Sequence, residues 1–216
     1  SDYLETNTFN TYDANGNIIQ YEDLGNGSAD DKVTAKIAYH ESTNPYYGGI
    51  AKQLEVYTSE GLRRKRTAAV NPATAEVTQI SNYSAADKIA VTDIVYDIYG
   101  NLTYVLPPKA DGIITAAILD GLCYQYKYDN KNRLAEKKLP GKQWEFIVYD
   151  KLDRPVATGP AFSPFKDETT EGWLITKYDA FGRPIYTGWS AQASNAVTRK
   201  ALQDVQNKAN VLFEFR

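Results

Sequence analysis

The residues of this chain that could do acid–base chemistry are five aspartates, each directly after a tyrosine. Paired carboxylates hydrolyse glycosides, one as the acid and the other as base or nucleophile. Each Tyr-Asp pair opens a similar six-residue segment, and these segments are Tyr12–Asn17, Tyr96–Asn101, Tyr128–Arg133, Tyr149–Arg154 and Tyr178–Arg183. A turn accounts for every pair, because Asp is favoured at the first position of a type I turn, where its carboxylate accepts backbone N–H groups. We therefore expect no enzymatic activity from them.

The fourth position of the same turns supports this interpretation. In a hairpin that residue lies in the left-handed region and forms a bulge with the returning strand. Glycine tolerates this backbone best, and Asn or Asp come next. The turns begin at Asp13, Asp97, Asp129, Asp150 and Asp179, and their fourth residues are Gly16, Gly100, Asn132, Asp153 and Gly182. All five obey the rule, so we predict a positive φ at each of these fourth positions.

Two other sets of side chains could bind a ligand. The run Leu62–Arg66 is the basic cluster of the chain and could bind an acidic partner, although a solvated strand face explains it better in a chain of net charge −3. Tryptophan side chains could stack on sugars, but aromatic residues in sheets more often belong to the core. The tryptophans are Trp144, Trp173 and Trp189. We therefore predict no binding residue from either set.

The bulk composition excludes several functions. A single cysteine (Cys123) and a single histidine (His40) rule out internal disulfides and argue against a metal site or a nucleophile–base pair. With 24 basic and 27 acidic residues, the chain has no basic surface of the kind that nucleic acid or an anionic membrane requires. No run of 18 apolar residues is present, so no membrane span is expected. We expect no cofactor.

Minor features have structural explanations too. Cys123 lies in a strand-like run, where a small buried thiol is expected. Three segments match the N-glycosylation acceptor pattern, and the turn role of Asn101 already accounts for one of them. They are Asn26-Gly27-Ser28, Asn82-Tyr83-Ser84 and Asn101-Leu102-Thr103.

The elements that position the turns are predicted to be strands. Seventeen tyrosines and alternating runs such as Cys123–Tyr128 and Trp144–Tyr149 indicate strands with one buried face. Residues 32–91 also alternate, with turn signals at Asn44-Pro45 and Ser59–Gly61. The chain end differs and predicts one amphipathic helix over Ser194–Leu212, capped by Ser194, followed by a short strand-like segment to Phe215. Its expected apolar face comprises Val197, Ala201, Leu202, Val205, Ala209 and Leu212.

The repeated Tyr-Asp-x-x-Gly-Arg/Asn-hydrophobic unit resembles the YD repeat of RHS proteins, of toxin-complex shell subunits and of teneurins. The stretch from Leu122 to Val156 is most similar to the N-terminal part of large bacterial RHS-repeat proteins. The resemblance covers roughly residues 92–189 with a further turn at 12–17, and residues 28–91 diverge from it. It implies an all-β fold, in which consecutive antiparallel hairpins form a curled sheet belonging to an RHS-type β-shell. We predict this repeat region over residues 1–189, and a C-terminal helix with a short end strand over 190–216.

The resemblance also implies a function by enclosure. In this family the YD hairpins spiral into a hollow shell that holds a C-terminal toxin or effector. The expected partners are therefore the rest of the full-length RHS protein and the enclosed effector, with secretion machinery or a cell-surface target as further candidates. The expected location is the bacterial cell surface or the exterior. Methionine is absent, so we expect a piece of a larger protein, and the missing Asp-Pro-x-Gly-Leu stretch means that no self-cleavage is assigned.

A second hypothesis stays open. Tyrosine-rich and tryptophan-rich faces could make the chain a surface adhesion or recognition module that binds glycans or a partner protein, as in the teneurin-like branch. A lectin or cell-wall anchor domain next to this segment would favour adhesion, whereas a variable C-terminal domain would favour the shell.

Overall fold

The computed structural model describes residues 7–26, 28–43, 46–84, 87–162, 170–192 and 198–214. The chain divides into two compact units, Ser1–Ile118 and Leu119–Arg216. The boundary that we predicted at residue 189 separates the repeat region from the C-terminal helix and is a different division of the chain. It stays a prediction. In the structure the C-terminal helix belongs to the second unit.

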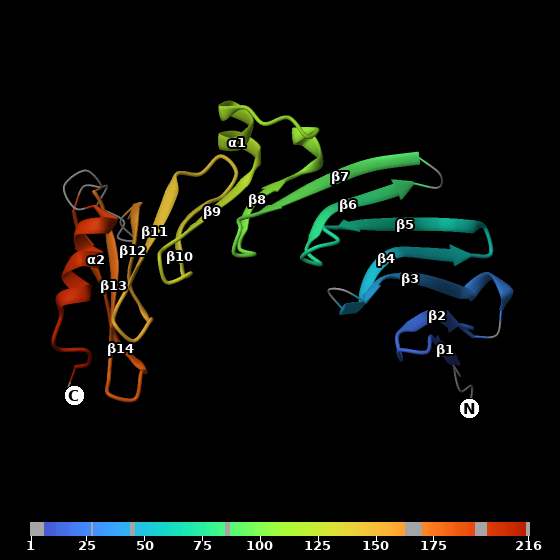
Figure 1. Ribbon diagram of the computed structural model, residues 1–216, viewed down its shortest axis with the longest axis horizontal. Coiled ribbons are helices and arrows are strands. Elements are labelled where there is room, and N and C mark those ends of the chain that lie inside the picture. Colours follow the sequence, from blue (N-terminus) through green and yellow to red (C-terminus); the bar gives the residue numbers. More distant parts are fainter. Residues whose placement is uncertain are drawn as a thin grey trace. The chain divides into compact units, whose positions relative to one another are not determined.

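The first unit is an antiparallel sheet whose described strands pair in the order in which they occur in the chain (Figure 1). Its strands are β1 (Thr8–Tyr12), β2 (Ile18–Asp23), β3 (Val33–Thr43), β4 (Tyr46–Thr58), β5 (Gly61–Val70), β6 (Val77–Ser84), β7 (Asp87–Tyr96) and β8 (Leu102–Leu106). Two short 3₁₀ helices, η1 (Ala29–Asp31) and η2 (Pro108–Ala110), lie in its loops, and α1 (Ala116–Leu122) contains the boundary between the units. No crossover interrupts the described strand order, because each connection is a hairpin.

The second unit is built in the same way. Its strands are β9 (Tyr124–Tyr128), β10 (Leu134–Lys138), β11 (Trp144–Tyr149), β12 (Pro155–Phe162), β13 (Glu171–Tyr178) and β14 (Pro184–Ala191). They are followed by the helix α2 (Arg199–Lys208) (Figure 1). The prediction of an all-β fold of consecutive antiparallel hairpins with one C-terminal helix is therefore confirmed, and the short helix α1 is an addition to it.

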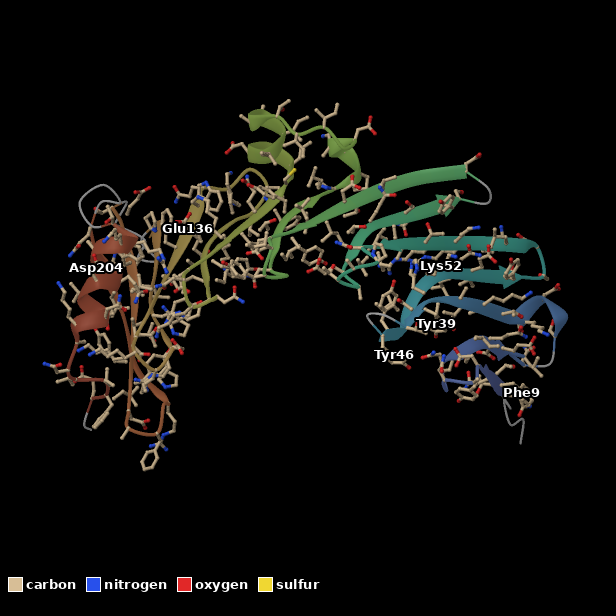
Figure 2. All side chains as sticks on the ribbon, in the orientation of Figure 1. Phe9, Tyr39, Tyr46, Lys52, Glu136 and Asp204 are labelled. Carbon is tan, nitrogen blue, oxygen red and sulfur yellow. The ribbon has the colours of Figure 1, made fainter. Side chains whose placement is uncertain are left out.

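The sheet of the first unit is a single layer. Side chains project from both of its faces, and no helix of this unit covers β2 to β6 (Figure 2). Among the described residues of the unit, Ser81, Leu106 and Ala110 are the buried ones. The chain is long enough to bury a larger core, so the half-exposed faces of this sheet are a property of the fold.

The two faces of this layer differ in chemistry. On one face, polar side chains pair across strands: Lys65 Nζ lies 3.2 Å from Glu55 Oε1, and the Tyr57 hydroxyl donates to Glu55 Oε2 at 2.8 Å. The hydrogen bond from Tyr57 lowers the pKa of Glu55, and it raises the pKa of the Tyr57 hydroxyl. Farther along, Gln79 Nε2 donates to Asp93 Oδ1 at 2.8 Å. Because strand side chains alternate between faces, the opposite face carries aliphatic residues such as Ile37, Leu54 and Val56, together with Arg64, Arg66 and Asn82.

The second unit does have a core. Val148, Ala157 and Trp173 are buried together, and Leu202 of α2 packs against them. Gly159 leaves room for this packing, because a Cβ there would lie 3.1 Å from Trp173 Cε3. The helix therefore covers one face of the sheet around β11 to β13.

The helix itself departs from its prediction. It begins at Arg199, and the Thr198 hydroxyl caps it by accepting a hydrogen bond from Ala201 N at 3.2 Å. The predicted cap Ser194 lies outside the described residues. The helix ends at Lys208 and not at Leu212, and residues 211–214 form no strand, contrary to the prediction; Phe215 lies outside the described residues.

The expected apolar face of the helix is also corrected. Val205 is 62% exposed, whereas the polar Gln203 is buried. The reason is that the helix meets the sheet through backbone groups of β11 as well as through aliphatic side chains, and an amide side chain matches those groups.

Candidate functional site

The five Tyr-Asp segments all form the predicted hairpin turns. Each fourth residue has a positive φ, as predicted: Gly16 +84°, Gly100 +81°, Asn132 +62°, Asp153 +59° and Gly182 +77°. In every turn the strand register shifts at the tyrosine or next to the returning strand, which is the bulge expected of a left-handed residue at this place. The turns are thus defined by backbone conformation as well as by sequence.

The aspartate carboxylate closes each turn by accepting from the backbone. In the third turn, Asp129 Oδ1 accepts from Lys131 N at 2.9 Å and from Arg133 N at 3.1 Å. The other four aspartates accept from the residues two and four positions ahead at 2.8–2.9 Å. These aspartates are Asp13, Asp97, Asp150 and Asp179. One carboxylate oxygen therefore satisfies two backbone donors that the bulge leaves without strand partners.

The second carboxylate oxygen binds the side chain of the fifth turn residue. In the first two turns this is an asparagine, and Asn17 Nδ2 and Asn101 Nδ2 donate at 2.9 and 3.0 Å. In the last three turns it is an arginine, whose Nε donates to the aspartate at 2.6–2.9 Å. These arginines are Arg133, Arg154 and Arg183. The pairing explains why the sixth residue of each Tyr-Asp segment is Asn or Arg.

The hydrogen bonds lower the pKa of several turn carboxyls. For Asp13 and Asp97 the main cause is the side-chain hydrogen bond from Asn17 or Asn101. For Asp129 and Asp179 burial acts in the opposite direction, and it is outweighed by hydrogen bonds from the backbone and from the arginine side chain, so that the pKa is again lowered. The ionised form of each of these carboxyls is therefore the one that the fold binds.

A further arrangement, which sequence reasoning missed, joins the Asp129 turn to the hairpin of Asp150, and the Asp150 turn to the hairpin of Asp179. The Tyr149 hydroxyl donates to Leu134 O at 2.8 Å, and the Tyr178 hydroxyl donates to Pro155 O at 2.7 Å. In both cases the accepting residue directly follows the arginine of the preceding turn. That arginine also lies over the same tyrosine ring, 4.5 Å from the centroid for Arg133 and 4.6 Å for Arg154.

The first unit repeats the tyrosine part of this arrangement. The Tyr96 hydroxyl donates to Val77 O at 3.3 Å, and the Tyr39 hydroxyl donates to Ile18 O at 2.8 Å. Ile18 follows Asn17, which stands where later turns have arginine. Three tyrosines of the motif, Tyr96, Tyr149 and Tyr178, thus tie their own hairpin to the previous turn, and Tyr39 does the same outside the motif. We call this contact the tyrosine tie.

A related turn, one residue longer, lies in the stretch that diverges from the repeat: Asn71 N donates to Glu76 O, whereas Asp13 N donates to Asn17 O. Asn71 takes the place of the aspartate, and its Oδ1 accepts from Ala73 N at 3.0 Å. Ala75 has a φ of +62° and Glu76 occupies the position before the returning strand. The sequence signal is weak, because alanine is a poor left-handed residue and glutamate replaces arginine or asparagine. The Tyr96 tie to Val77 is the evidence that this turn belongs to the series.

The turns of each unit lie along one edge of its sheet, because every second connection in an up-and-down antiparallel sheet falls on the same edge. Neighbouring turns leave an open groove of about 590 Å³ in the first unit, lined by Asn71, Thr74, Glu76, Thr78 and Ile94–Gly100. Aromatic side chains at this edge are exposed, among them Tyr99 (75%) in the first unit and Phe181 (84%) in the second. We call this end of the strands the turn edge. It carries the repeated turns, and its exposed aromatic side chains make it a candidate contact surface.

The remaining candidate residues are accounted for individually. Trp173 is buried in the core, so it is not a sugar platform, and Trp144 lies under the Lys127 ammonium at 4.3 Å. His40 Nε2 is 2.8 Å from Ala68 O, and Cys123 is fully buried. Asn101, which also stands in an N-glycosylation acceptor pattern, donates a hydrogen bond to Asp97 within its own turn.

No group of three or more His, Cys, Asp or Glu side chains in the described part of the chain could hold a metal ion. None of its helices combines the length and the apolar character that crossing a membrane requires.

The fold and the turn edge together define a class: an open antiparallel array in which hairpins with Asp-clamped turns follow one another in chain order. No family model and no curated protein matches the sequence. Among solved structures, the chain is similar to the crystal structure of TcdB2-TccC3-Cdc42, with 14% sequence identity and a TM-score of 0.42. The match covers 95% of this chain and 11% of that chain. It is also similar to the Tc holotoxin pore of Photorhabdus luminescens, with 13% sequence identity and a TM-score of 0.41. That match covers 90% of this chain and 11% of that chain. The chain therefore spans about a tenth of the length of these structures.

Proposed function

We propose that this chain is a non-catalytic wall segment of a large secreted bacterial RHS-type shell protein, which encloses a C-terminal toxin or effector. The observation that carries the proposal is the tyrosine tie, by which four of the described turns are each completed by the hairpin after them. Such a series can be extended hairpin by hairpin without a new fold at each step. That is what the wall of a shell requires.

The two outer strands of the array support the same role. Among the described strands, β1 pairs with β2 alone and β14 pairs with β13 alone. Each of these outer strands therefore offers an unpaired row of backbone donors and acceptors to a neighbouring strand. In the proposed shell the rest of the polypeptide continues the wall by pairing with these outer strands.

The test is protease protection in the longest natural polypeptide that contains this segment. We expect the region C-terminal to the shell to resist trypsin under native conditions and to become sensitive when Asp150 and Asp179 are both changed to alanine. The matched control replaces the exposed Lys151 and Lys200 by alanine and should leave protection intact. Digestion of the C-terminal region at the same rate in all three proteins would contradict enclosure.

The absence of catalysis is part of the proposal. The turn carboxylates are each occupied by backbone donors and by an Asn or Arg side chain, which leaves no oxygen pair free to act on a substrate. We expect no turnover on a panel of glycosides and esters. Reproducible turnover that is abolished by a single Asp→Asn exchange would refute this.

The second candidate function, recognition of glycans or of a partner protein at a surface, is favoured by one observation. Large side chains at the turn edge are exposed, including Tyr46 (78%), Tyr99 (75%) and Phe181 (84%). Aromatic rings of this kind stack on sugars and enrich protein interfaces. A glycan array separates the candidates: saturable binding that is lost in Tyr99→Ala and Phe181→Ala would favour recognition over enclosure.

A further inference from the structure

The basic run of β5 is divided by the strand into two pairs with different surroundings. Lys65 points to the polar face, where it lies 3.2 Å from Glu55. Arg63 is the extra residue of a β-bulge between Leu62 and Arg64. It pairs with Glu60 and also donates to Thr58 Oγ1 at 3.2 Å. Half of the basic run is thus neutralised within the sheet.

Arg64 and Arg66 lie on the opposite face. Their cross-strand neighbours on β4 are Val56 and Leu54, and Leu54 in turn pairs with Ile37 of β3. Both arginines are exposed, and neither makes an ion pair or a hydrogen bond with any described residue. Two unpaired guanidinium groups therefore stand in the middle of an aliphatic sheet face.

The carboxylates that share this face by register do not neutralise them. Asp23, opposite Val33, accepts a hydrogen bond from Gly25 N at 2.9 Å. Asp87, opposite Ser84, forms no ion pair with either arginine within the described residues. Arg64 and Arg66 therefore have no ion-pair partner among the described residues, although the chain as a whole has a net charge of −3.

We propose that this face binds an acidic polypeptide segment in extended conformation, with carboxylates two residues apart and aliphatic residues near them. Arg64 and Arg66 are separated by two residues on one strand, about 7 Å, which is the spacing of alternate side chains in an extended peptide. A guanidinium binds a carboxylate in bidentate fashion. Val56, Leu54 and Ile37 would contact the apolar side chains of the partner. The proposal names partner chemistry and does not depend on the shell role.

The test uses the full chain and a fluorescein-labelled peptide with glutamates at two alternate positions, leucines at the next two alternate positions and serines between them, so that the charged and apolar side chains share one face of the extended peptide. Binding is followed by fluorescence anisotropy at low salt and at about 0.15 M salt, where exposed charges more than roughly 8 Å apart are screened. We expect saturable binding, weakened roughly tenfold in Arg64→Gln/Arg66→Gln, because two charged hydrogen-bonding groups are lost. The matched control, Arg63→Gln/Lys65→Gln, removes the same charge from two residues of the same strand that are already paired with Glu60 and Glu55, and it should retain the wild-type affinity.

Each other outcome overturns the proposal. If both double variants lose affinity equally, the peptide responds to net charge and not to this face. If the peptide with glutamine in place of glutamate binds as well, acidity is not recognised. If the chain does not bind the peptide but binds vesicles with anionic lipids, or associates with itself through Arg64 and Arg66, the occupant is different from the one proposed. Circular dichroism of all variants verifies that they are folded, so a loss of affinity reports the contact.

Discussion

The guanidinium carbon of Arg133 lies 4.5 Å from the centroid of the Tyr149 ring, while the hydroxyl of that tyrosine donates to the carbonyl oxygen of Leu134 at 2.8 Å. One turn thereby supplies a cation and an acceptor to a single side chain of the next hairpin. Arg133 also binds the carboxylates of Asp129 and Asp153. Two consecutive turns are joined through this one arginine.

Arg133→Ala is expected to lower the free energy of unfolding of the second unit by about 2–3 kcal/mol, since hydrogen bonds to charged groups and a largely buried ion pair are lost. The side chains of Arg133 and Asp129 are 14% and 10% exposed. Tryptophan fluorescence during urea unfolding reports on this unit alone, because all three tryptophans lie in it.

Arg183→Ala is the matched control for that change. Arg183 makes the same pair with Asp179, but its side chain is 70% exposed. An exposed pair contributes about 1 kcal/mol or less, so a loss as large as that of Arg133→Ala would show that burial and the stacked tyrosine do not matter.

Gly182→Val is expected to destabilise the second unit by more than ~1 kcal/mol, because a β-branched residue is strained at positive φ. The φ of Gly182 is +77°, and the nearest atom to an added Cβ is 3.9 Å away. Space is therefore available, and the backbone conformation causes the cost. Gly182→Asn should lose much less stability, because the related turns have Asn132 and Asp153 at the same position. Equal urea midpoints for the Val and Asn variants would contradict this explanation.

Acid should weaken the second unit through its turn carboxyls. The pKa values of Asp129 and Asp179 are lowered in the folded state. Their stabilisation is complete above the unfolded pKa of about 3.9, and it is lost as the pH falls through the folded values. We therefore expect the urea midpoint to drop below about pH 4. The drop should be smaller in Asp129→Asn/Asp179→Asn and unchanged in Lys151→Gln; the same slope in all three proteins would exclude these carboxyls as the cause.

Gln203→Ala should expose the Tyr149 backbone. The amide side chain of Gln203 accepts from Tyr149 N at 3.0 Å and donates to Tyr149 O at 2.8 Å, as a neighbouring strand would. Leaving these buried groups without partners costs about 1–3 kcal/mol. Hydrogen exchange of the Tyr149 amide should accelerate in Gln203→Ala and stay slow in Lys200→Ala, whose side chain is 84% exposed. Unchanged protection in both variants would contradict the role of Gln203.

The sequence was sufficient for features that depend on local backbone chemistry. The positive φ of Asn132 and Asp153 followed from their turn position, although neither is glycine. The turn at Asn71–Glu76 was missed, because Ala75 and Glu76 both depart from the pattern and only the distant Tyr96 identifies it.

Features that depend on register were not accessible from the sequence. The contact of Tyr149 with Leu134 spans 15 residues and that of Tyr178 with Pro155 spans 23, so it requires the strand alignment to be known. Gln203 was missed because hydrophobic periodicity cannot identify a polar side chain that is buried against backbone groups. The division of the basic run into paired and unpaired residues likewise depends on what lies opposite each residue in β4.

The tyrosine ties all run in one direction along the chain. In each of them the acceptor comes first in the sequence and the tyrosine later, as with Ile18 and Tyr39 or Leu134 and Tyr149. During synthesis from the N-terminus, a turn therefore emerges from the ribosome before the residue that locks it. The tie on each of these turns can therefore close only after the following hairpin has been synthesised.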